Sequence, residues 1–120
     1  GSRMHILLVD DEKVVIQPLA RLLGKLGNSV ACAHNGEEAL LIIENQRVDL
    51  LISDIRMPQM DGVRLMQASR NLKPNLPIIL MAGYIEDEMR EKVAWGGLCR
   101  LLPKPIDLEI LLTTIKEMEQ

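Results

Sequence analysis

Three aspartates and one lysine, each placed just after a short apolar run, are the residues of this chain most suited to chemistry. They are Asp10, Asp11, Asp54 and Lys104. If the apolar runs are parallel strands of one sheet, their carboxyl ends meet at one edge. The sequence therefore predicts a pocket at that edge with three carboxylates and one ammonium group.

A pocket of this composition requires a cation or a carboxyl group with a raised pKa, because carboxylates at short distance repel one another. Two carboxylates about 5 Å apart, at an effective dielectric constant of about 20, repel by roughly 3 kcal/mol. Mg²⁺ would offset the repulsion, since it takes its oxygen ligands from one or two carboxylates and from water. The ammonium group of Lys104 adds a compact positive charge. Such a pocket binds phosphate oxygens and leaves one carboxylate free as a nucleophile.

Five short apolar segments alternate along the chain with five segments of helical periodicity. The strands are predicted at 4–9, 29–33, 48–53, 78–81 and 99–102. The helices are predicted at 12–26, 37–45, 63–72, 86–95 and 108–118. This alternation is typical of an open parallel sheet with helices on both faces and right-handed crossovers. The elements would therefore bring the four chemical residues to the carboxyl edge of the sheet.

Length and composition indicate one globular domain. At 120 residues, 48% of them apolar, the chain can bury a core without disulfide bonds. A net charge of −3 with both signs interspersed argues against a nucleic-acid surface. No apolar run is long enough to cross a membrane, and no secretory pattern precedes the first strand. We expect a cytoplasmic domain with reduced, buried Cys32 and Cys99, and we interpret residues 1–3 as an expression-tag remnant.

Three motifs give the chain a resemblance to the response-regulator receiver domain of two-component phosphorelay systems. They are the acidic segment at 9–12, the segment Asp-Ile-Arg-Met-Pro-Gln-Met-Asp-Gly at 54–62, and the dipeptide Lys104-Pro105. Any one of them alone is weak, but the three in this order and at these separations are highly specific. The resemblance covers 4–120 and implies a flavodoxin-like (βα)5 three-layer sandwich. Its parallel five-stranded sheet would have the strand order 2-1-3-4-5.

The resemblance also implies a role for each residue of the pocket. Asp54 would be the phosphoacceptor and would take a phosphoryl group from the phosphohistidine of a histidine kinase or a histidine phosphotransfer protein. Mg²⁺ would be bound by Asp10, Asp11, Asp54 and the backbone carbonyl of Arg56. Lys104 would pair with the phosphoryl group. The domain would then catalyse its own phosphorylation and dephosphorylation and would not be a conventional enzyme.

Further implications concern the backbone and the partners. The Lys104–Pro105 peptide bond would be cis, and backbone groups of Arg56 and Gly83 would contact the phosphoryl group. The face formed by the fourth helix, the fifth strand and the fifth helix would bind an effector domain or a second copy of the chain. No nucleic acid or membrane is expected as a partner of this domain.

The sequence departs from the receiver pattern at two switch positions. The family places Thr or Ser at the end of the fourth strand, where this chain has Ala82. It places Tyr or Phe three residues before the lysine, where this chain has Leu101. Three interpretations stay open: normal switching through the backbone near Arg56 and Gly83, a phosphate sink or relay that transmits little, or a degenerate or engineered receiver used for docking.

Two other classes of protein share the predicted architecture. A metal-dependent aspartyl phosphohydrolase usually carries an Asp-x-Asp pair after the first strand, whereas the aspartates at 10–11 are adjacent. A flavin- or nucleotide-binding domain needs a phosphate-cradling loop at that point. The acidic residues at 10–12 would repel phosphate unless a metal intervened.

The sequence also predicts whether several apolar and aromatic side chains are buried or exposed. Helical spacing places one apolar stripe on the inward side of the first helix: Val15, Leu19, Leu22, Leu23 and Leu26. Trp95 is expected to be partly buried. Tyr84 is expected at the surface as a binding contact, with the alternative that it swings over the pocket and supplies a hydroxyl group.

Overall fold

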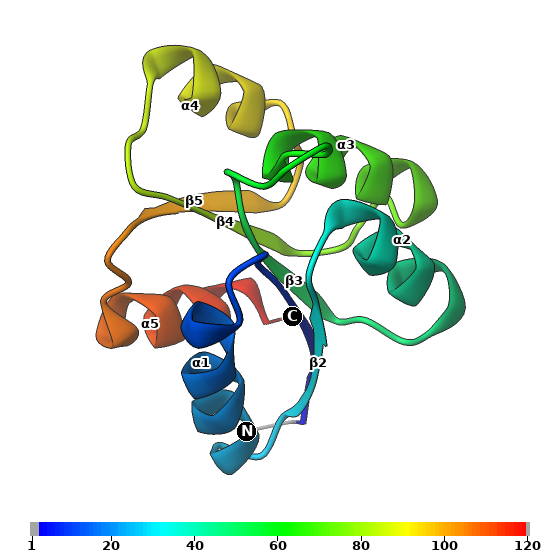
Figure 1. The fold of residues 1–120 in the computed structure, drawn as a ribbon, viewed down its shortest axis with the longest axis vertical. Helices are drawn as coiled ribbons and strands as arrows, with labels where there is room; N and C mark the ends of the chain where they lie inside the picture. Colours follow the sequence, from blue (N-terminus) through cyan, green and yellow to red (C-terminus); the bar gives the residue numbers. More distant parts are fainter. Residues whose placement is uncertain (1–2, 120) are drawn as a thin grey trace.

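The computed structural model describes residues 3–119, which form a three-layer α/β sandwich (Figure 1). The strands are β1 His5–Val9, β2 Ser29–Ala33, β3 Leu50–Asp54, β4 Ile78–Ala82 and β5 Cys99–Pro103. The helices are α1 Lys13–Lys25, α2 Gly36–Asn45, α3 Gly62–Leu72, α4 Asp87–Ala94 and α5 Leu108–Met118. All strand pairs are parallel, and the sheet has the order β2-β1-β3-β4-β5. The predicted fold class and strand order are confirmed.

Side-chain caps determine where three of the helices begin. Asn35, Asp61 and Asp107 precede α2, α3 and α5, and each accepts a hydrogen bond from a backbone N–H of the first turn. Such a cap satisfies one of the donors that a helix start leaves free. The N-cap residues of α1 and α4, Glu12 and Glu86, make no such bond within the described chain. The starts of these two helices are therefore less firmly fixed than the other three.

The core consists of two apolar layers, one on each face of the sheet. Helices α1 and α5 cover one face, and α2, α3 and α4 cover the other (Figure 1). Strands β3 and β4 are buried at every position, as expected for central parallel strands that are covered on both faces. The sheet therefore has a rigid centre from which its carboxyl edge projects.

Helix α1 buries part of the predicted stripe and exposes the rest. Ile16 and Leu23 are buried against the sheet, whereas Val15 is 37% exposed and Leu26 is 55% exposed. The prediction for Val15 and Leu26 was wrong because α1 carries more apolar residues than one packed face can cover. The prediction for Trp95 was also wrong, since its side chain is 86% exposed.

The two cysteines are less buried than the sequence predicted. Cys32 and Cys99 are unpaired and partly buried. Burial raises the pKa of the Cys99 thiol to about 12 and also raises the pKa of Cys32. Neither thiol is therefore ionised to a useful extent near neutral pH.

None of the helices within residues 3–119 has both the length and the apolar character that crossing a membrane requires.

Candidate functional site

The register of the sheet brings the ends of four strands to the same level. Val9 pairs with Ser53, and Ala82 pairs with Pro103 in the neighbouring ladder. The residues that follow these pairs are therefore forced together at the carboxyl edge. This placement comes from strand pairing alone, because the residues involved lie far apart in the sequence.

Lys104 connects the aspartates of two strands. Its ammonium Nζ lies 2.9 Å from Oδ2 of Asp54 and 3.6 Å from Oδ2 of Asp10. Its backbone N–H donates to the carbonyl of Ala82 at 2.8 Å, and the Lys104–Pro105 peptide bond is cis. Burial by itself would lower the pKa of Lys104, but the two carboxylates outweigh this effect and raise it. The lysine is therefore charged over the whole physiological pH range.

Asp54 is buried, and the loop behind it fixes its position. Its Oδ1 accepts a hydrogen bond from the backbone N–H of Arg56 at 3.3 Å. Gly62 packs against the same backbone, because a Cβ atom at Gly62 would lie 2.5 Å from the carbonyl oxygen of Asp54. Glycine is needed there for close approach of two backbone segments. One carboxylate oxygen of Asp54 thus faces Lys104 and the other faces the loop.

The first strand ends in a cluster of acidic groups. One oxygen from each of Asp10, Asp11 and Glu12 lies within 4.8 Å of the others; Asp10 is buried, and Asp11 and Glu12 are exposed. Oδ1 of Asp10 accepts from the backbone N–H of Glu12 at 2.9 Å, but Oδ2 has no hydrogen-bond partner among the described residues. Burial is the main reason why the pKa of Asp10 is raised, although Lys104 and the Glu12 N–H act in the opposite direction.

This donor set fits a hard divalent cation. Carboxylate oxygens are the ligands that Mg²⁺ prefers. The buried Oδ2 of Asp10 faces Lys104 at 3.6 Å but accepts no hydrogen bond from the described residues, so it is open to a further cation. Glu12 was missed as a possible ligand in the sequence analysis, although its position directly after two aspartates could have suggested it. The oxygens of Asp54 stand outside this cluster and connect to it through Lys104.

The remaining predicted site residues lie around this centre. Arg56 and Gly83 are exposed, and Ala82 is fully buried at the end of β4. Leu101 is partly buried on β5 and packs against the core layer beneath α2, α3 and α4. A direct contact of the Arg56 carbonyl with metal, and of the Arg56 and Gly83 backbone with a phosphoryl group, stays a prediction.

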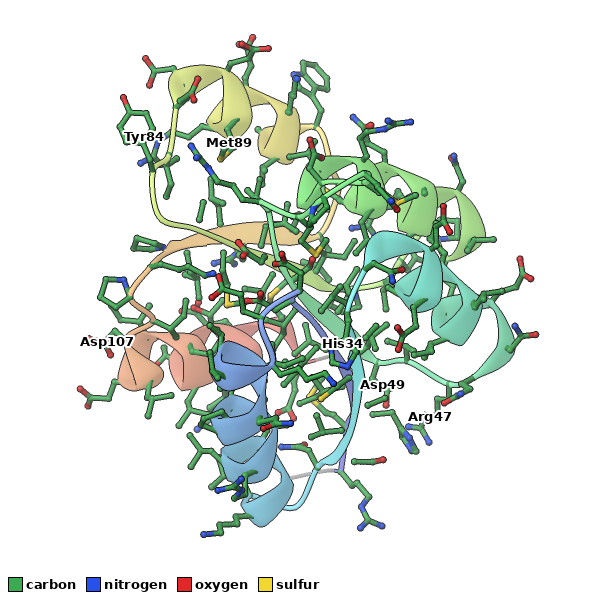
Figure 2. All side chains as sticks on the ribbon, in the orientation of Figure 1. His34, Arg47, Asp49, Tyr84, Met89 and Asp107 are labelled. Carbon is green, nitrogen blue, oxygen red and sulfur yellow. The ribbon has the colours of Figure 1, made fainter. Side chains whose placement is uncertain are left out.

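Tyr84 lies outside the pocket. Its side chain is 66% exposed and points away from the sheet edge beside α4 (Figure 2). This placement agrees with the expectation of a surface residue. In this conformation its hydroxyl group does not replace the one that Ala82 lacks.

An apolar groove beside the pocket escaped the sequence analysis. It has a volume of about 420 Å³ and runs between α1 and the start of α5. Its lining consists of Val15, Pro18, Leu19, Leu22, Lys104, Pro105, Ile106 and Leu108. The sequence signal was the surplus of apolar residues in α1 at spacings of three and four, which includes Val15 and Leu22. The groove thus shares Lys104 with the acidic pocket.

Comparison with known proteins was made at the level of family, sequence and structure. The family model described as "Response regulator receiver domain" matches residues 6–116. The chain is 39% identical over 115 residues to the sensor kinase CckA of Brucella abortus, with 94% of this chain and 12% of CckA covered. It is 38% identical over 117 residues to the response regulator MprA of Mycobacterium avium, with 96% of this chain and 50% of MprA covered.

Solved structures agree with these matches. A receiver domain protein described as CheY-like, from Methanospirillum hungatei, superimposes with a TM-score of 0.91 at 31% identity, covering 97% of this chain and 93% of the other. The receiver domain of the hybrid histidine kinase CckA gives 0.81 at 36% identity, covering 97% and 99%. The chain spans half or less of the two relatives compared by sequence, which are longer proteins. The chain belongs to the response regulator receiver domain family.

Proposed function

We propose that Asp54 is the phosphoacceptor of a two-component signalling protein and that it takes its phosphoryl group from a phosphohistidine. The observation that carries the proposal is the contact between Asp54 Oδ2 and Lys104 Nζ at 2.9 Å, next to the acidic cluster of β1. A carboxylate held beside an ammonium group and a cation site can approach an anionic phosphoryl group without prohibitive repulsion. The donor would be a histidine kinase or a histidine phosphotransfer protein.

The transfer step is a displacement at phosphorus. A carboxylate oxygen of Asp54 forms a bond to phosphorus while the bond from phosphorus to the imidazole nitrogen breaks. The imidazole nitrogen keeps the electron pair of the broken bond, and the ring leaves as neutral histidine because its other nitrogen is protonated before transfer. Lys104 stays protonated and neutralises negative charge on the phosphoryl oxygens. The product is an acyl phosphate on Asp54.

Mg²⁺ is part of this proposal. Asp10 and Asp11 would hold it, with Asp54, the Arg56 carbonyl and Glu12 as further oxygen donors. When bound, the ion supplies positive charge that binds phosphoryl oxygens and offsets repulsion in the site. The chain then acts as its own catalyst, and the acyl phosphate is later lost when water attacks phosphorus and releases phosphate from Asp54. No separate enzymatic turnover of an external substrate is proposed.

The apolar groove gives the phosphodonor a place to bind. A partner surface that fills the space between α1 and Pro105 lies directly beside Lys104, and therefore beside Asp54. An apolar helix face is a suitable occupant, because the lining is almost wholly aliphatic. The proposal includes a cytoplasmic site of action, and output through an effector domain or a second copy at the face of α4, β5 and α5.

The test is phosphorylation of the chain by a small phosphodonor. The domain is incubated with Mg²⁺ and acetyl phosphate, and its intact mass and the modified peptide are measured. We expect one phosphoryl group on Asp54. No phosphoryl group should be added when Mg²⁺ is chelated before the reaction. An unmodified native chain, or equal labelling of Asp54→Asn, would contradict the proposal. Asp49→Asn serves as the matched control, since Asp49 lies at the opposite edge of the sheet.

A weakly transmitting receiver is the second candidate, and Ala82 with Leu101 is the observation that favours it. A methyl group cannot donate a hydrogen bond to a phosphoryl oxygen, and an aliphatic side chain has no ring to reorient. In this version Asp54 is phosphorylated, but the domain acts as a phosphate sink or docking module. Beryllofluoride with Mg²⁺ separates the two: amide shifts confined to the neighbourhood of Asp54 favour the sink, and shifts along α4 favour switching.

A further inference from the structure

Helix α4 is held most firmly at its carboxyl end. In its first turn Met89 is only partly buried where it packs against the core layer. Of its eight described residues only Val93 is buried, and its N-cap residue Glu86 makes no side-chain hydrogen bond within residues 3–119. The other end leads into Gly96 and Gly97, which pack tightly on α3. A Cβ atom at Gly96 would overlap Sδ of Met66, and Gly97 has a φ of +76°.

The tight end is fastened by Arg70, in the last turn of α3. Its Nε donates to the carbonyl of Gly96 at 2.8 Å, and its Nη2 donates to that of Leu98 at 3.3 Å. Its Nη1 donates to the carbonyls of Pro74 at 3.0 Å and Leu76 at 2.5 Å. One guanidinium group therefore joins the loop before β4 to the loop before β5.

The chemistry of Arg70 differs from that of the other paired cations. Arg47, Lys92, Arg100 and Lys104 each pair with a carboxylate, whereas Arg70 forms no ion pair within the described residues and binds four neutral carbonyls. Partial burial lowers its pKa, which shows that the position is unfavourable for charge. Guanidinium is suited to this task because its donors have a fixed planar arrangement.

We propose that Arg70 is the fixed pivot of α4, so that occupation of Asp54 displaces the uncapped start of the helix about Gly96 and Gly97. The start of α4 is connected to the pocket through Gly83–Glu86, which directly follow Ala82 at the end of β4. Tyr84 lies at this mobile end, and Trp95 lies at the pivot. The inference rests on the proposed function, because it describes how a phosphorylated Asp54 reaches the surface.

The pivot is tested first in the free protein, where the proposed phosphorylation plays no part. Amide hydrogen exchange is measured for the native chain, Arg70→Lys and Gly97→Ala. Lysine keeps the charge but cannot span four carbonyls, and a Cβ at Gly97 would lie 3.2 Å from Nε of Arg70. Both variants should speed exchange at Gly96 and Cys99 by about tenfold. The control Arg21→Lys, on the exposed side of α1, should leave the exchange rates of Gly96 and Cys99 unchanged. Native-like exchange in both test variants would overturn the proposal that Arg70 is the pivot.

The second test uses the fact that the chain has one Trp and one Tyr. Labelling with 5-fluorotryptophan and 3-fluorotyrosine places one ¹⁹F resonance at the pivot and one at the mobile end. With Mg²⁺ and beryllofluoride, the Tyr84 resonance should shift while that of Trp95 stays within its linewidth. In Arg70→Lys both resonances should shift.

The outcomes separate the pivot from the proposed function. A Trp95 shift as large as that of Tyr84 in the native chain would overturn the pivot, and so would two stationary resonances while amides beside Asp54 respond. If beryllofluoride leaves the amides beside Asp54 unchanged as well, the proposed function fails. The exchange measurement in the free protein then decides separately whether Arg70 fixes this end of α4.

Discussion

The two edges of the sheet carry aspartates in opposite situations. At the carboxyl edge, Asp10 is fully buried, one of its oxygens has no hydrogen-bond partner among the described residues, and its pKa is raised. At the amino edge, Asp49 accepts from the His5 N–H at 2.8 Å and from Arg47 Nε at 3.2 Å (Figure 2). Burial by itself would raise the pKa of Asp49, but these donors outweigh it and the pKa is lowered.

The difference separates an edge with a fully hydrogen-bonded carboxylate from the edge at which we propose that Mg²⁺ binds. Asp49 joins the starts of β1 and β3 by two hydrogen bonds. Its carboxylate accepts from the His5 N–H, and its own N–H donates to the carbonyl of His5 at 2.7 Å. Asp10 is less well satisfied, since its Oδ2 accepts no hydrogen bond from the described residues and faces the ammonium group of Lys104 at 3.6 Å. The same side-chain type is thus hydrogen-bonded through both oxygens at one edge and through one oxygen at the other.

The largest effect is expected from Asp10→Asn. Loss of the buried carboxylate should weaken Mg²⁺ binding by at least about 100-fold, while the metal-free domain should gain about 1 kcal/mol of stability because less buried charge is left unsatisfied. Titration calorimetry with Mg²⁺ and urea unfolding in a chelator measure the two quantities. A variant that is both less stable and fully able to bind Mg²⁺ would remove the contrast between the edges.

The next effect is expected from Asp49→Asn, which should lower stability by about 1–2 kcal/mol at pH 7 and leave Mg²⁺ affinity unchanged. A lowered folded-state pKa stabilises the protein above the unfolded pKa, and this contribution is lost as the pH falls through the folded value. The native and variant unfolding curves should therefore converge below about pH 4. Asp87→Asn, at an exposed position of α4, is the control. If the stability difference between the native chain and Asp49→Asn stayed the same below about pH 4, the charge of Asp49 would not be its cause.

Ala82→Thr addresses the part of the carboxyl edge that lacks a donor. Ala82 is fully buried, so the larger side chain should cost about 1 kcal/mol in the free protein. With Mg²⁺ and beryllofluoride the new hydroxyl should bind the ligand and raise its affinity about fivefold. Ala82→Val introduces a side chain of similar shape without the hydroxyl. It should show only the loss of stability and no gain in affinity. Equal beryllofluoride affinities for the two variants would show that the missing hydroxyl at position 82 does not limit ligand binding.

The smallest effect is expected from Gln59→Gly. Gln59 has a φ of +69°, and the turn is closed by the Met60 N–H donating to the carbonyl of Pro58 at 2.8 Å. Glycine relieves the left-handed strain but has more freedom in the unfolded chain, so the net gain is only about 0.5 kcal/mol. Gln59→Ala retains the strain and should not be stabilising. Urea unfolding of the three proteins tests whether the loop after Asp54 is strained.

Much of this fold could be predicted because its local signals agree with one another. Central strands such as 50–54 and 78–82 are short and begin with an apolar run, and Asn35, Asp61 and Asp107 are good caps at helix starts. The pocket was predictable for a related reason. In a parallel sheet the carboxyl end of each strand falls on the same edge, so residue type and position were sufficient to group Asp10, Asp54 and Lys104.

Features that depend on the packing of two elements could not be predicted in this way. The groove arises because α1 and the start of α5 leave Val15 and Leu22 between them, and periodicity cannot tell a packed residue from one at the rim. Arg70 donates to two carbonyls that lie 26 and 28 positions further along the chain. These acceptors are backbone groups, which carry no sequence signature. Trp95 was misplaced because an aromatic residue at a helix end normally packs, whereas here two glycines occupy the packed position.

The contact between Asp54 and Lys104 has a consequence for the order in which the protein becomes competent. The two residues are separated by 50 positions, and Lys104 follows the edge strand β5, which pairs with β4 alone. A ribosome-bound chain that has exposed β1 to β4 already carries every acidic group of the pocket but not the cation that pairs with them. The ion pair is therefore completed only when the last strand docks, and under the proposed function Asp54 would become a competent acceptor only after that step.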